Sequence, residues 1–255
     1  MQDHSQTTWQ QNRTSWAVDR VGILSLLRDA TIGAIHLIPH GSNYTFLVQL
    51  TSDTAGQSWA IYKPRKGEAP LYDFPDGTLF KREYAAYLVS EALGWRLVPP
   101  TLVRDGPHGV GSVQLFIESD PNVHYFLFKD RRIEEARKTA AFDLVVNNAD
   151  RKAGHCLEGF DGKLWLIDNG LTFNYAPKLR TVVWDFQGED IPPTLVDDLA
   201  RLRQAILAPG TLSAELASLL SIEEMRAFEE RLEETIGNPV FPRPGYYRSV
   251  PWPPV

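Results

Sequence analysis

Two short polar stretches in the second half of the sequence contain residue types that could transfer a phosphoryl group. The first is Asp150-x-Lys152-x-x-His155, which directly follows the apolar end of a predicted helix, and the second contains Asp168 at the end of a short apolar run. Phosphoryl transfer needs an acid that orients the acceptor hydroxyl, a cation on the moving phosphoryl group and oxygen ligands for a divalent metal ion. Asp150, Lys152 and Asp168 supply one of each, so the two stretches together predict this chemistry.

The first half of the sequence contains parts that could hold a nucleotide. A turn between two strand-like stretches could cover phosphates with its backbone N–H groups. A lysine closes the third such stretch, and an acid on the following predicted helix could hold that lysine. Each feature alone is common in ordinary hairpins and surface helices, but their order ahead of Asp150 and Asp168 indicates a nucleotide site. The residues are Gly41, Ser42 and Asn43 in the turn, then Lys63 and Glu83.

A further apolar stretch, 113–117, predicts a strand at the boundary between the two halves. Its backbone groups would meet the edge of an adenine ring if a nucleotide lay between the halves. Gln114 and Phe116 are therefore the candidate adenine contacts.

The motifs also carry a resemblance to a known family. Asn148-Ala149-Asp150-Arg151, with Ile167-Asp168-Asn169-Gly170-Leu171-Thr172-Phe173, resembles the catalytic and metal-binding loops of the phosphatidylinositol 3-/4-kinase-like family within the protein-kinase-like superfamily. The resemblance is greatest to the type II phosphatidylinositol 4-kinases and to small bacterial members, and with the latter it extends to 179–184 and 251–253. It implies that Asp150 is the catalytic acid, that Asp168 is the main metal ligand, and that the cofactors are ATP and Mg or Mn.

His155 departs from the family pattern, which usually has Asn at this last position of the catalytic loop. Magnesium prefers oxygen donors, whereas an imidazole suits manganese, zinc or iron. His155 is therefore either the second metal ligand or a residue that packs beside the site. The identity of the metal, Mg or Mn, stays open with it.

The order of predicted elements favours an α+β protein with a two-lobed protein-kinase-like fold, in which a β-rich N-lobe precedes a mostly helical C-lobe. The strand-like stretches are 34–39, 44–51, 58–63, 111–118 and 163–167, and the predicted helices are 18–32, 79–93, 131–147, 195–207 and 222–236. The expected domains are a flexible tail at 1–16, the N-lobe at 17–120, the C-lobe at 121–237 and a proline-rich C-terminal strap at 238–255.

The composition counts against several classes of protein. The 255 residues have a formal net charge of −6, whereas a nucleic-acid-binding face is strongly basic. The sequence has no apolar run near the length of about 18 residues that spans a membrane, and its single cysteine, Cys156, fits a reducing compartment. We therefore expect a cytoplasmic protein with no nucleic-acid partner and no integral membrane association, and its oligomeric state stays open.

These features predict an ATP-dependent phosphotransferase that passes the γ-phosphoryl group to a hydroxyl on a lipid, a protein or a small molecule. The alternative is a catalytically weak or inactive nucleotide-binding pseudokinase that acts as a sensor or scaffold, which His155 and the short glycine turn motivate. A metal-dependent phosphohydrolase is disfavoured because the sequence lacks an Asp-x-Asp or His-Asp pair. The lack of a polybasic cluster weakens the lipid alternative among the acceptors.

Overall fold

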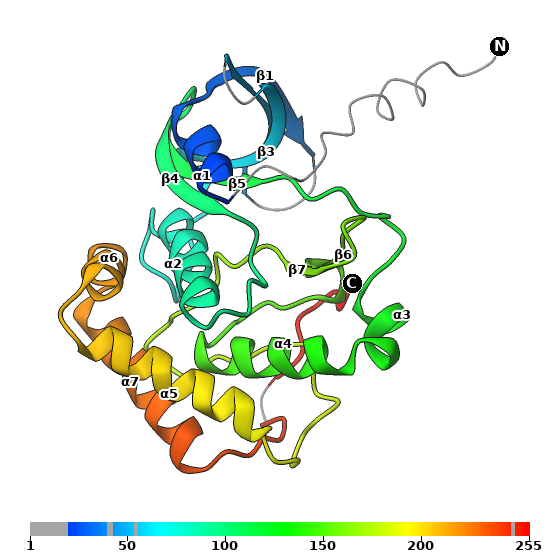
Figure 1. Cartoon of the computed structure of the whole chain (residues 1–255), viewed down its shortest axis with the longest axis vertical. Helices are drawn as coiled ribbons and strands as arrows, with labels where there is room; N and C mark the ends of the chain where they lie inside the picture. The colour runs from blue at the N-terminus through cyan, green and yellow to red at the C-terminus, as the bar shows by residue number, and fades with distance from the viewer. Residues whose placement is uncertain (1–19, 40–42, 54–55, 246–247) are drawn as a thin grey trace.

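The computed structural model describes residues 20–39, 43–53, 56–245 and 248–255 (Figure 1). An antiparallel sheet forms most of the N-terminal part, residues 20–115, and helices dominate the C-terminal part, residues 125–255. This arrangement confirms the predicted α+β class with a β-rich first part and a helical second part. The predicted tail, 1–16, lies outside the described residues.

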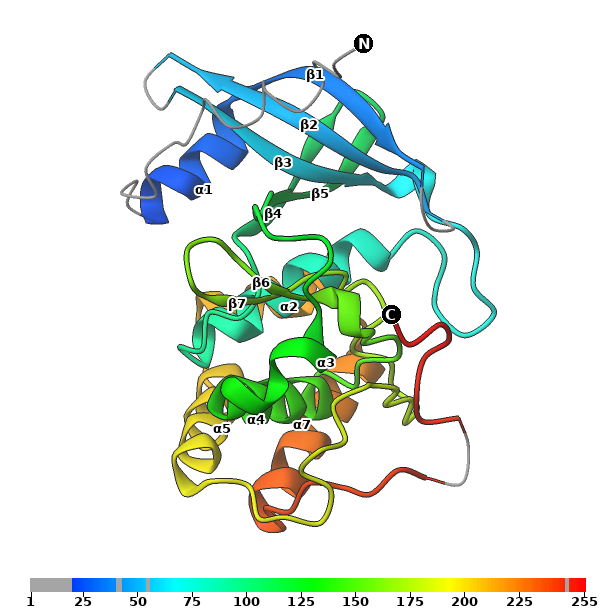
Figure 2. The same cartoon turned by 90° about the vertical axis from the view of Figure 1, so that its right-hand side faces the viewer.

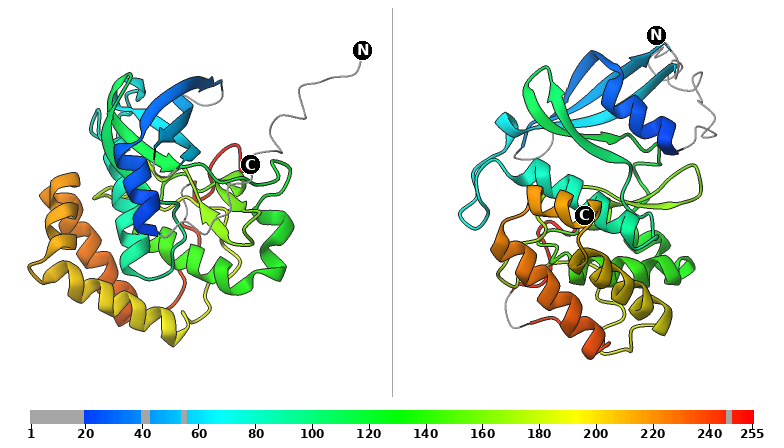
Figure 3. Two further views of the ribbon diagram at one scale, coloured as in Figure 1. Left: turned by 45° about the horizontal axis from the view of Figure 1, so that its top comes forward. Right: turned by 60° about the vertical axis from the view of Figure 1, so that its left-hand side comes forward.

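The N-terminal sheet has five strands in the order β1-β2-β3-β5-β4, all paired antiparallel. One side chain in two along β3 is buried, namely Ala60, Tyr62 and Pro64, so the alternating pattern of a half-buried strand holds there. Helix α1, Arg20–Asp29, packs against this sheet with Leu26 and Leu27 buried (Figure 3). The strands are β1 Thr31–Ile38, β2 Thr45–Ser52, β3 Gly56–Pro64, β4 Thr101–Gly106 and β5 Gly109–Leu115.

Helix α2, Leu79–Ala92, follows the sheet's third strand and lies between the two parts of the molecule (Figure 2). The carboxylate of Glu68 accepts hydrogen bonds from the N–H groups of Leu79 (3.0 Å) and Phe80 (2.8 Å), which have no partner within the helix. At the other end Gly94 adopts a φ of +72°, the left-handed conformation that commonly ends a helix. Figure 3 shows α6 beside α2, and the two helices are in contact.

The C-terminal part packs its helices around one apolar core. Helix α5 buries Leu195, Leu199, Leu202 and Ile206, a spacing that places all four on one helical face. A short hairpin of two strands, β6 and β7, comes after α4 and before α5 in the sequence, and it pairs Cys156 with Leu166. The elements are α3 Tyr125–Phe128, α4 Ile133–Val145, β6 Cys156–Glu158, β7 Leu164–Leu166, α5 Pro193–Leu207, α6 Thr211–Leu219 and α7 Ile222–Gly237, with short 3-10 turns η2 Arg65–Gly67, η3 Lys129–Arg131 and η4 Ala153–His155.

Several predicted boundaries are wrong by a few residues. The first strand begins at Thr31 rather than residue 34, because Gly33 lies inside it where the register with β2 shifts between Ile32 and Ile35. The strand predicted over 111–118 ends at Leu115, where its pairing with β3 and β4 stops. Short elements such as α3, α6 and β6 were not predicted. The lobe boundary near residue 120 falls between β5 and α3, and the exact domain limits stay a prediction.

Within the described residues, no helix is long and apolar enough to cross a membrane.

Candidate active site

The strand lysine and the helix acid predicted from the sequence meet Asp168 in the structure. Lys63 Nζ, at the end of β3, forms an ion pair with Glu83 on α2 and lies 2.8 Å from Asp168 Oδ1. The other oxygen of Glu83 accepts a hydrogen bond from the backbone N–H of Asn169 (3.0 Å). Groups 105 residues apart in the sequence therefore meet at one point between the N-terminal and C-terminal parts.

The charges at this point stabilise one another. Burial by itself lowers the pKa of Lys63, but the carboxylates of Asp168 and Glu83 outweigh it and raise that pKa above its ordinary value. Lys63 is in turn the largest cause that holds the pKa of Asp168 below its ordinary value. Both groups are therefore charged at neutral pH, and 51% of the Asp168 side chain stays exposed. Because Lys63 keeps this carboxylate ionised and half of it is exposed, a cation from solvent can reach it.

Asp168 has an unusual backbone conformation for a residue with a side chain. Its φ is +57°, in the left-handed region that favours glycine. The residue comes two positions after the end of β7, and the carbonyl of the intervening Ile167 accepts a hydrogen bond from Arg151 Nη1 (2.8 Å). Strained positions of this kind cluster where a side chain must point in a set direction. Here the strained turn directs the carboxylate towards Lys63.

The catalytic-loop candidates lie beside the same carboxylate. Lys152 Nζ is 3.5 Å from Asp150 Oδ2, and His155 Nε2 is 3.4 Å from Asp168 Oδ2. Burial is the largest cause that raises the pKa of Asp150. Its backbone N–H donates to Asn148 Oδ1 (2.9 Å), an Asx-type contact that sets the direction of the loop. One group of polar and charged side chains, which we call the cleft cluster, thus contains Lys63, Glu83, Asp150, Lys152, His155 and Asp168.

The ring of His155 is held through Nδ1 and presents Nε2 to Asp168. Nδ1 accepts a hydrogen bond from the backbone N–H of Lys152 (3.4 Å), which places the proton of a neutral ring on Nε2, facing Asp168. Burial lowers the pKa of His155 to about 4, so the ring is neutral at neutral pH. In this arrangement the Nε2–H of His155 faces Asp168 Oδ2 across 3.4 Å.

A second group of polar and charged side chains is fully buried and is centred on Arg151, the residue between Asp150 and Lys152. This group was not predicted from the sequence. Arg151 donates to both oxygens of Asp143 (3.1 and 3.2 Å) and to Asn169 Oδ1 (2.6 Å). Asp143 also accepts from Asn148 (3.0 Å) and Thr181 (3.1 Å). Both Asp143 and Arg151 have 0% exposure. We call these five residues the support cluster, and an acid within the apolar stretch 142–146 is the signal that could have revealed it.

Arg82, the neighbour of Glu83 on α2, is also buried and was not predicted. It forms an ion pair with Glu224 on α7, and its Nη1 donates to the carbonyl of Thr172 (2.7 Å). Glu224 also closes a capping box at the start of α7, since its other oxygen accepts a hydrogen bond from the N–H of Ser221 (2.9 Å). Adjacent residues of α2 therefore bind the cleft lysine on one side and the C-terminal helices on the other.

The predicted phosphate turn is only partly described. Gly41 and Ser42 lie outside the described residues, and Asn43 Oδ1 accepts a hydrogen bond from the N–H of Ala69 (2.7 Å). The predicted adenine contacts lie in and just after β5. Gln114 donates its amide to Thr101 (2.9 Å), and Phe116 donates its N–H to the carbonyl of Trp59 (3.0 Å). The side-chain amide of Gln114 and the backbone N–H of Phe116 already donate to groups of the N-terminal sheet. An adenine ring here would therefore have to contact other polar groups of residues 113–117.

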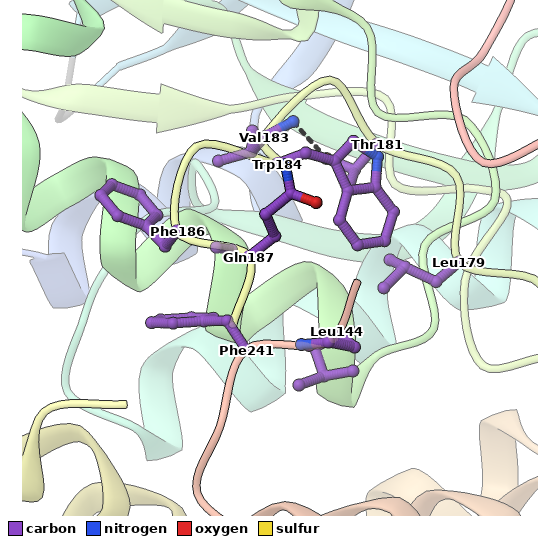
Figure 4. Close-up of a pocket in the computed structure, with 10 residues that line it drawn as sticks. Leu144, Leu179, Thr181, Val183, Trp184, Phe186, Gln187 and Phe241 are labelled. Carbon is purple, nitrogen blue, oxygen red and sulfur yellow. Dashed lines mark hydrogen bonds between the residues drawn. The ribbon is translucent and has the colours of Figure 1, made fainter. Parts of the chain in front are cut away.

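Among the described residues, no three His, Cys, Asp or Glu side chains form a metal-binding group by themselves. Asp168 and His155 provide one carboxylate and one imidazole, so a divalent ion at this place fits only with further oxygen ligands such as phosphates. Two pockets in the described part of the chain lie away from the cleft cluster. One, in the N-terminal part, has about 460 Å³ and is lined by Arg65, Lys66 and Asp76 among others. The other, behind Trp184, has about 10 Å³, room for roughly one water molecule (Figure 4).

The fold is similar to those of several solved kinases. A structure of the Golgi casein kinase with Mn and ADP bound aligns with a TM-score of 0.51 over 84% of this chain and 74% of that one, at 16% identity. The Helicobacter pylori proinflammatory kinase CtkA aligns with a TM-score of 0.50 over 84% of this chain and 94% of that one, at 12% identity. Hydra Fam20 aligns at 0.51 over 84% and 86%, also at 12% identity. The predicted protein-kinase-like fold is thereby confirmed.

Sequence comparison gives two relatives, and no family model matches the chain. Phosphatidylinositol 4-kinase gamma 4 of Oryza sativa is 31% identical over 160 residues, which are 48% of this chain and only 28% of that protein. Protein Rv2133c of Mycobacterium tuberculosis is 36% identical over 267 aligned positions, which cover 90% of this chain and 94% of that protein. The chain therefore belongs to the same protein family as Rv2133c.

Proposed function

We propose that this protein is an ATP-dependent phosphotransferase that passes the γ-phosphoryl group of ATP to a hydroxyl acceptor. The observation that carries the proposal is the meeting of Lys63, Glu83 and Asp168, with Asp150 and Lys152 on the adjacent loop. A lysine held by a helix acid, a metal-binding aspartate and a loop aspartate are the parts that kinase-like catalysis requires.

Each residue of the cleft cluster has a role in this proposal. Lys63, held in place by Glu83, contacts the α- and β-phosphates, and Asp168 holds the divalent ion. Asp150 orients the acceptor hydroxyl and accepts its proton, and Lys152 offsets charge on the phosphoryl group during transfer. A bound Mg or Mn ion would supply charge neutralisation at the phosphates. The catalytic effect of such a site comes from positioning and electrostatics.

The remaining assignments extend the proposal to the nucleotide and the metal. The adenine lies against the stretch of Gln114 and Phe116, and the turn at 41–43 covers the phosphates. Residues 17–120 are the nucleotide-binding lobe and 121–237 the catalytic lobe. His155 is the second metal ligand in the tautomer that carries its proton on Nδ1, which frees Nε2 and gives up the hydrogen bond from Lys152; otherwise it lies beside Asp168 with its Nε2–H facing the carboxylate. The name of the rice relative supports membership of the phosphatidylinositol 3-/4-kinase-like family, and the bound Mn and ADP of one structural neighbour support these cofactors.

A transfer assay with several acceptors tests this function. The protein is incubated with γ-labelled ATP and either Mg or Mn, in separate reactions with casein, with phosphatidylinositol vesicles, with a pool of small hydroxyl-bearing metabolites, and alone. We expect metal-dependent label in at least one acceptor, and no label with the Asp168→Asn variant. Equal labelling by the variant and the unaltered protein contradicts the assignment.

The alternative function is a nucleotide-binding pseudokinase, which the hydrogen bond at Nδ1 of His155 favours. Because that bond leaves the ring proton on Nε2, the nitrogen that faces Asp168 does not bind a metal ion in this tautomer, and Asp168 is the one candidate ligand left of the pair. Saturable binding of Mn-ADP in calorimetry, together with no label in any acceptor with either metal, supports this alternative and contradicts the transferase.

A further inference from the structure

The C-terminal segment, residues 248–255, contacts the loop that carries Asp150 and Lys152. The backbone carbonyl of Pro254 accepts a hydrogen bond from the N–H of Ala153 (2.8 Å). Ala153 begins the turn η4, between Lys152 and the ring of His155. Figure 2 shows this segment in red, where it rises along the helical part and ends near the junction of the two parts.

The same segment also holds the stretch that follows the Asp168 loop. The carbonyl of Ser249 accepts two hydrogen bonds, one from the backbone N–H of Thr181 (3.0 Å) and one from the indole N–H of Trp184 (3.1 Å). The contact at Pro254 and the contacts at Ser249 lie at opposite ends of the segment. The C-terminal segment therefore bridges two loops of the C-terminal part.

Those two loops are themselves paired through their backbones. The N–H of Arg151 donates to the carbonyl of Arg180 (3.0 Å), and the N–H of Val182 donates to the carbonyl of Arg151 (3.1 Å). Backbone donors alternate in direction along an extended chain, so the backbone N–H of Thr181 points away from the catalytic loop and towards Ser249. The stretch 180–182 thus lies between the catalytic loop and the C-terminal segment as the middle of three extended chains.

The donors that the segment satisfies are buried. Ala153 has 0% exposure and Thr181 has 2%, so water does not readily replace the carbonyls of Pro254 and Ser249. A buried backbone N–H without a partner is strongly disfavoured. Without the segment, the loop and the neighbouring stretch must rearrange to find other acceptors or water.

Apolar side chains that pack around Trp184 give residues 181–184 a second support. Figure 4 shows Leu144 from α4 and Phe241 from the C-terminal region beside the pocket that Trp184 lines. Its volume of about 10 Å³ leaves no room for a ligand. The apolar side chains of residues 181–184 therefore pack against other parts of the protein, and the backbone N–H of Thr181 is held by the carbonyl of Ser249.

We propose that residues 248–255 are a positioning element for phosphoryl transfer, which fixes the loop of Asp150 and Lys152 relative to Asp168. The inference rests on the proposed function. The segment's hydrogen bonds reach Ala153, Thr181 and Trp184 rather than Lys63 or Glu83, so its loss changes the rate of transfer and leaves nucleotide binding intact. A displacement of about 1 Å at a catalytic group lowers the rate roughly 100-fold.

The first test compares the full chain with a chain that ends at residue 247. We expect kcat for transfer to fall roughly 10- to 100-fold, while the KM for ATP stays within about twofold, because the contacts to nucleotide are unchanged. Hydrogen exchange at the amides of Ala153 and Thr181 should accelerate, with the amides of β2, β3 and α2 unchanged. An unchanged or increased kcat, or unchanged exchange at both amides, overturns the proposal.

A matched pair of tryptophan variants covers the case in which the shortened chain does not fold. Trp184→Phe removes the indole donor to Ser249 and keeps an aromatic ring, whereas Trp252→Phe makes the same change at a side chain of the segment that is 76% exposed. We expect Trp184→Phe to lower kcat about tenfold, the effect of one lost hydrogen bond, and Trp252→Phe to leave it unchanged. Equal kcat values for the two variants overturn the proposal.

Hydrogen exchange separates this inference from the function beneath it. If the full chain transfers no phosphate to any acceptor, the proposed function fails. Exchange at Ala153 and Thr181 in the shortened chain then still shows whether the segment holds the loop. Faster exchange supports the contact, and equal exchange contradicts it independently of activity.

Discussion

The cleft cluster and the support cluster alternate along the same stretches of chain but differ in almost every physical respect. Asp150 and Lys152 flank Arg151, and Asp168 precedes Asn169, so neighbouring residues belong to different clusters. In the cleft cluster 51% of Asp168 and 29% of Asp150 are accessible, although Glu83 is buried, whereas Arg151 has no exposure. On α2 the same division separates Glu83, which binds the cleft lysine, from Arg82, which binds Glu224.

The difference lies in what each cluster does with its charge. The support cluster satisfies its own hydrogen bonds, since Arg151 donates to Asp143, Ile167 and Asn169. The cleft cluster leaves carboxylate oxygens near solvent, where a metal ion or a hydroxyl can reach them. A buried and fully paired network fixes a backbone, and an incompletely paired one at the surface is available for chemistry. Substitutions in the first should therefore change stability, and substitutions in the second should change activity.

The largest effect is expected from Asp168→Asn. Loss of the carboxylate that is proposed to bind the metal ion should lower phosphoryl transfer by about 10³-fold or more, because a bound ion contributes several kcal/mol at the transition state. The melting temperature should change little, since half of this side chain is exposed. Transfer assays and thermal unfolding of the same preparation check both statements. A large loss of stability with retained transfer would place Asp168 in the supporting network instead.

Arg151→Met should show the opposite pattern. Removal of the cation leaves Asp143 buried without its partner and should lower the free energy of unfolding by about 3–5 kcal/mol. The control is Asp143→Leu combined with Arg151→Met, which removes both charges and should recover part of that loss. Urea unfolding of the three proteins measures the difference. Arg151→Met with unaltered stability would show that the buried pair does not hold the loop.

Lys152→Ala should have an intermediate effect, confined to activity. The side chain is 24% exposed and its ion pair is with Asp150, so its removal leaves no buried charge. We expect kcat to fall roughly 100-fold, the usual effect of one lost electrostatic contact to the transition state, with an unchanged melting temperature. Lys163→Ala, on the exposed hairpin beside Trp165, is a suitable control. Similar kcat values for the two variants would remove Lys152 from the mechanism.

The smallest effect is expected from His155→Asn, which introduces the residue usual at this position in the kinase family that the sequence resembles. If the ring contacts the metal, an oxygen donor should raise the ratio of Mg-supported to Mn-supported activity by about tenfold. If the ring only donates a hydrogen bond to Asp168, the ratio should stay constant while both activities fall together. Transfer rates measured across a series of Mg and Mn concentrations separate the two roles.

Sequence reasoning identified the cleft cluster because its members are recognised by chemical type and order along the chain. Lys63, Glu83, Asp150 and Asp168 need only be present in the right sequence to suggest one site, and the structure brings them together. The predicted strands and long helices follow from hydrophobic periodicity, which short elements such as α3 and β6 do not display.

The support cluster could not be predicted in the same way. Arg151 and Asp143 are eight residues apart and are joined by the bend after α4, where Asn147 has a φ of +53°. Pairings such as Arg82 with Glu224 span 142 residues and depend on how α2 packs against α7. Tertiary packing determines these contacts, and no local pattern of residue types specifies them. The bridge from residues 248–255 to Ala153 is of the same kind.

The most direct test of the account is to measure transfer of label from γ-labelled ATP by the Asp150→Asn variant, with Mn-ADP affinity measured on the same sample. Because Asp150 is proposed to orient the acceptor and accept its proton, transfer should fall roughly 10²- to 10⁴-fold. Affinity for Mn-ADP should be unchanged, because Lys63 and Asp168 remain in place. Transfer at the rate of the unaltered protein would contradict the account.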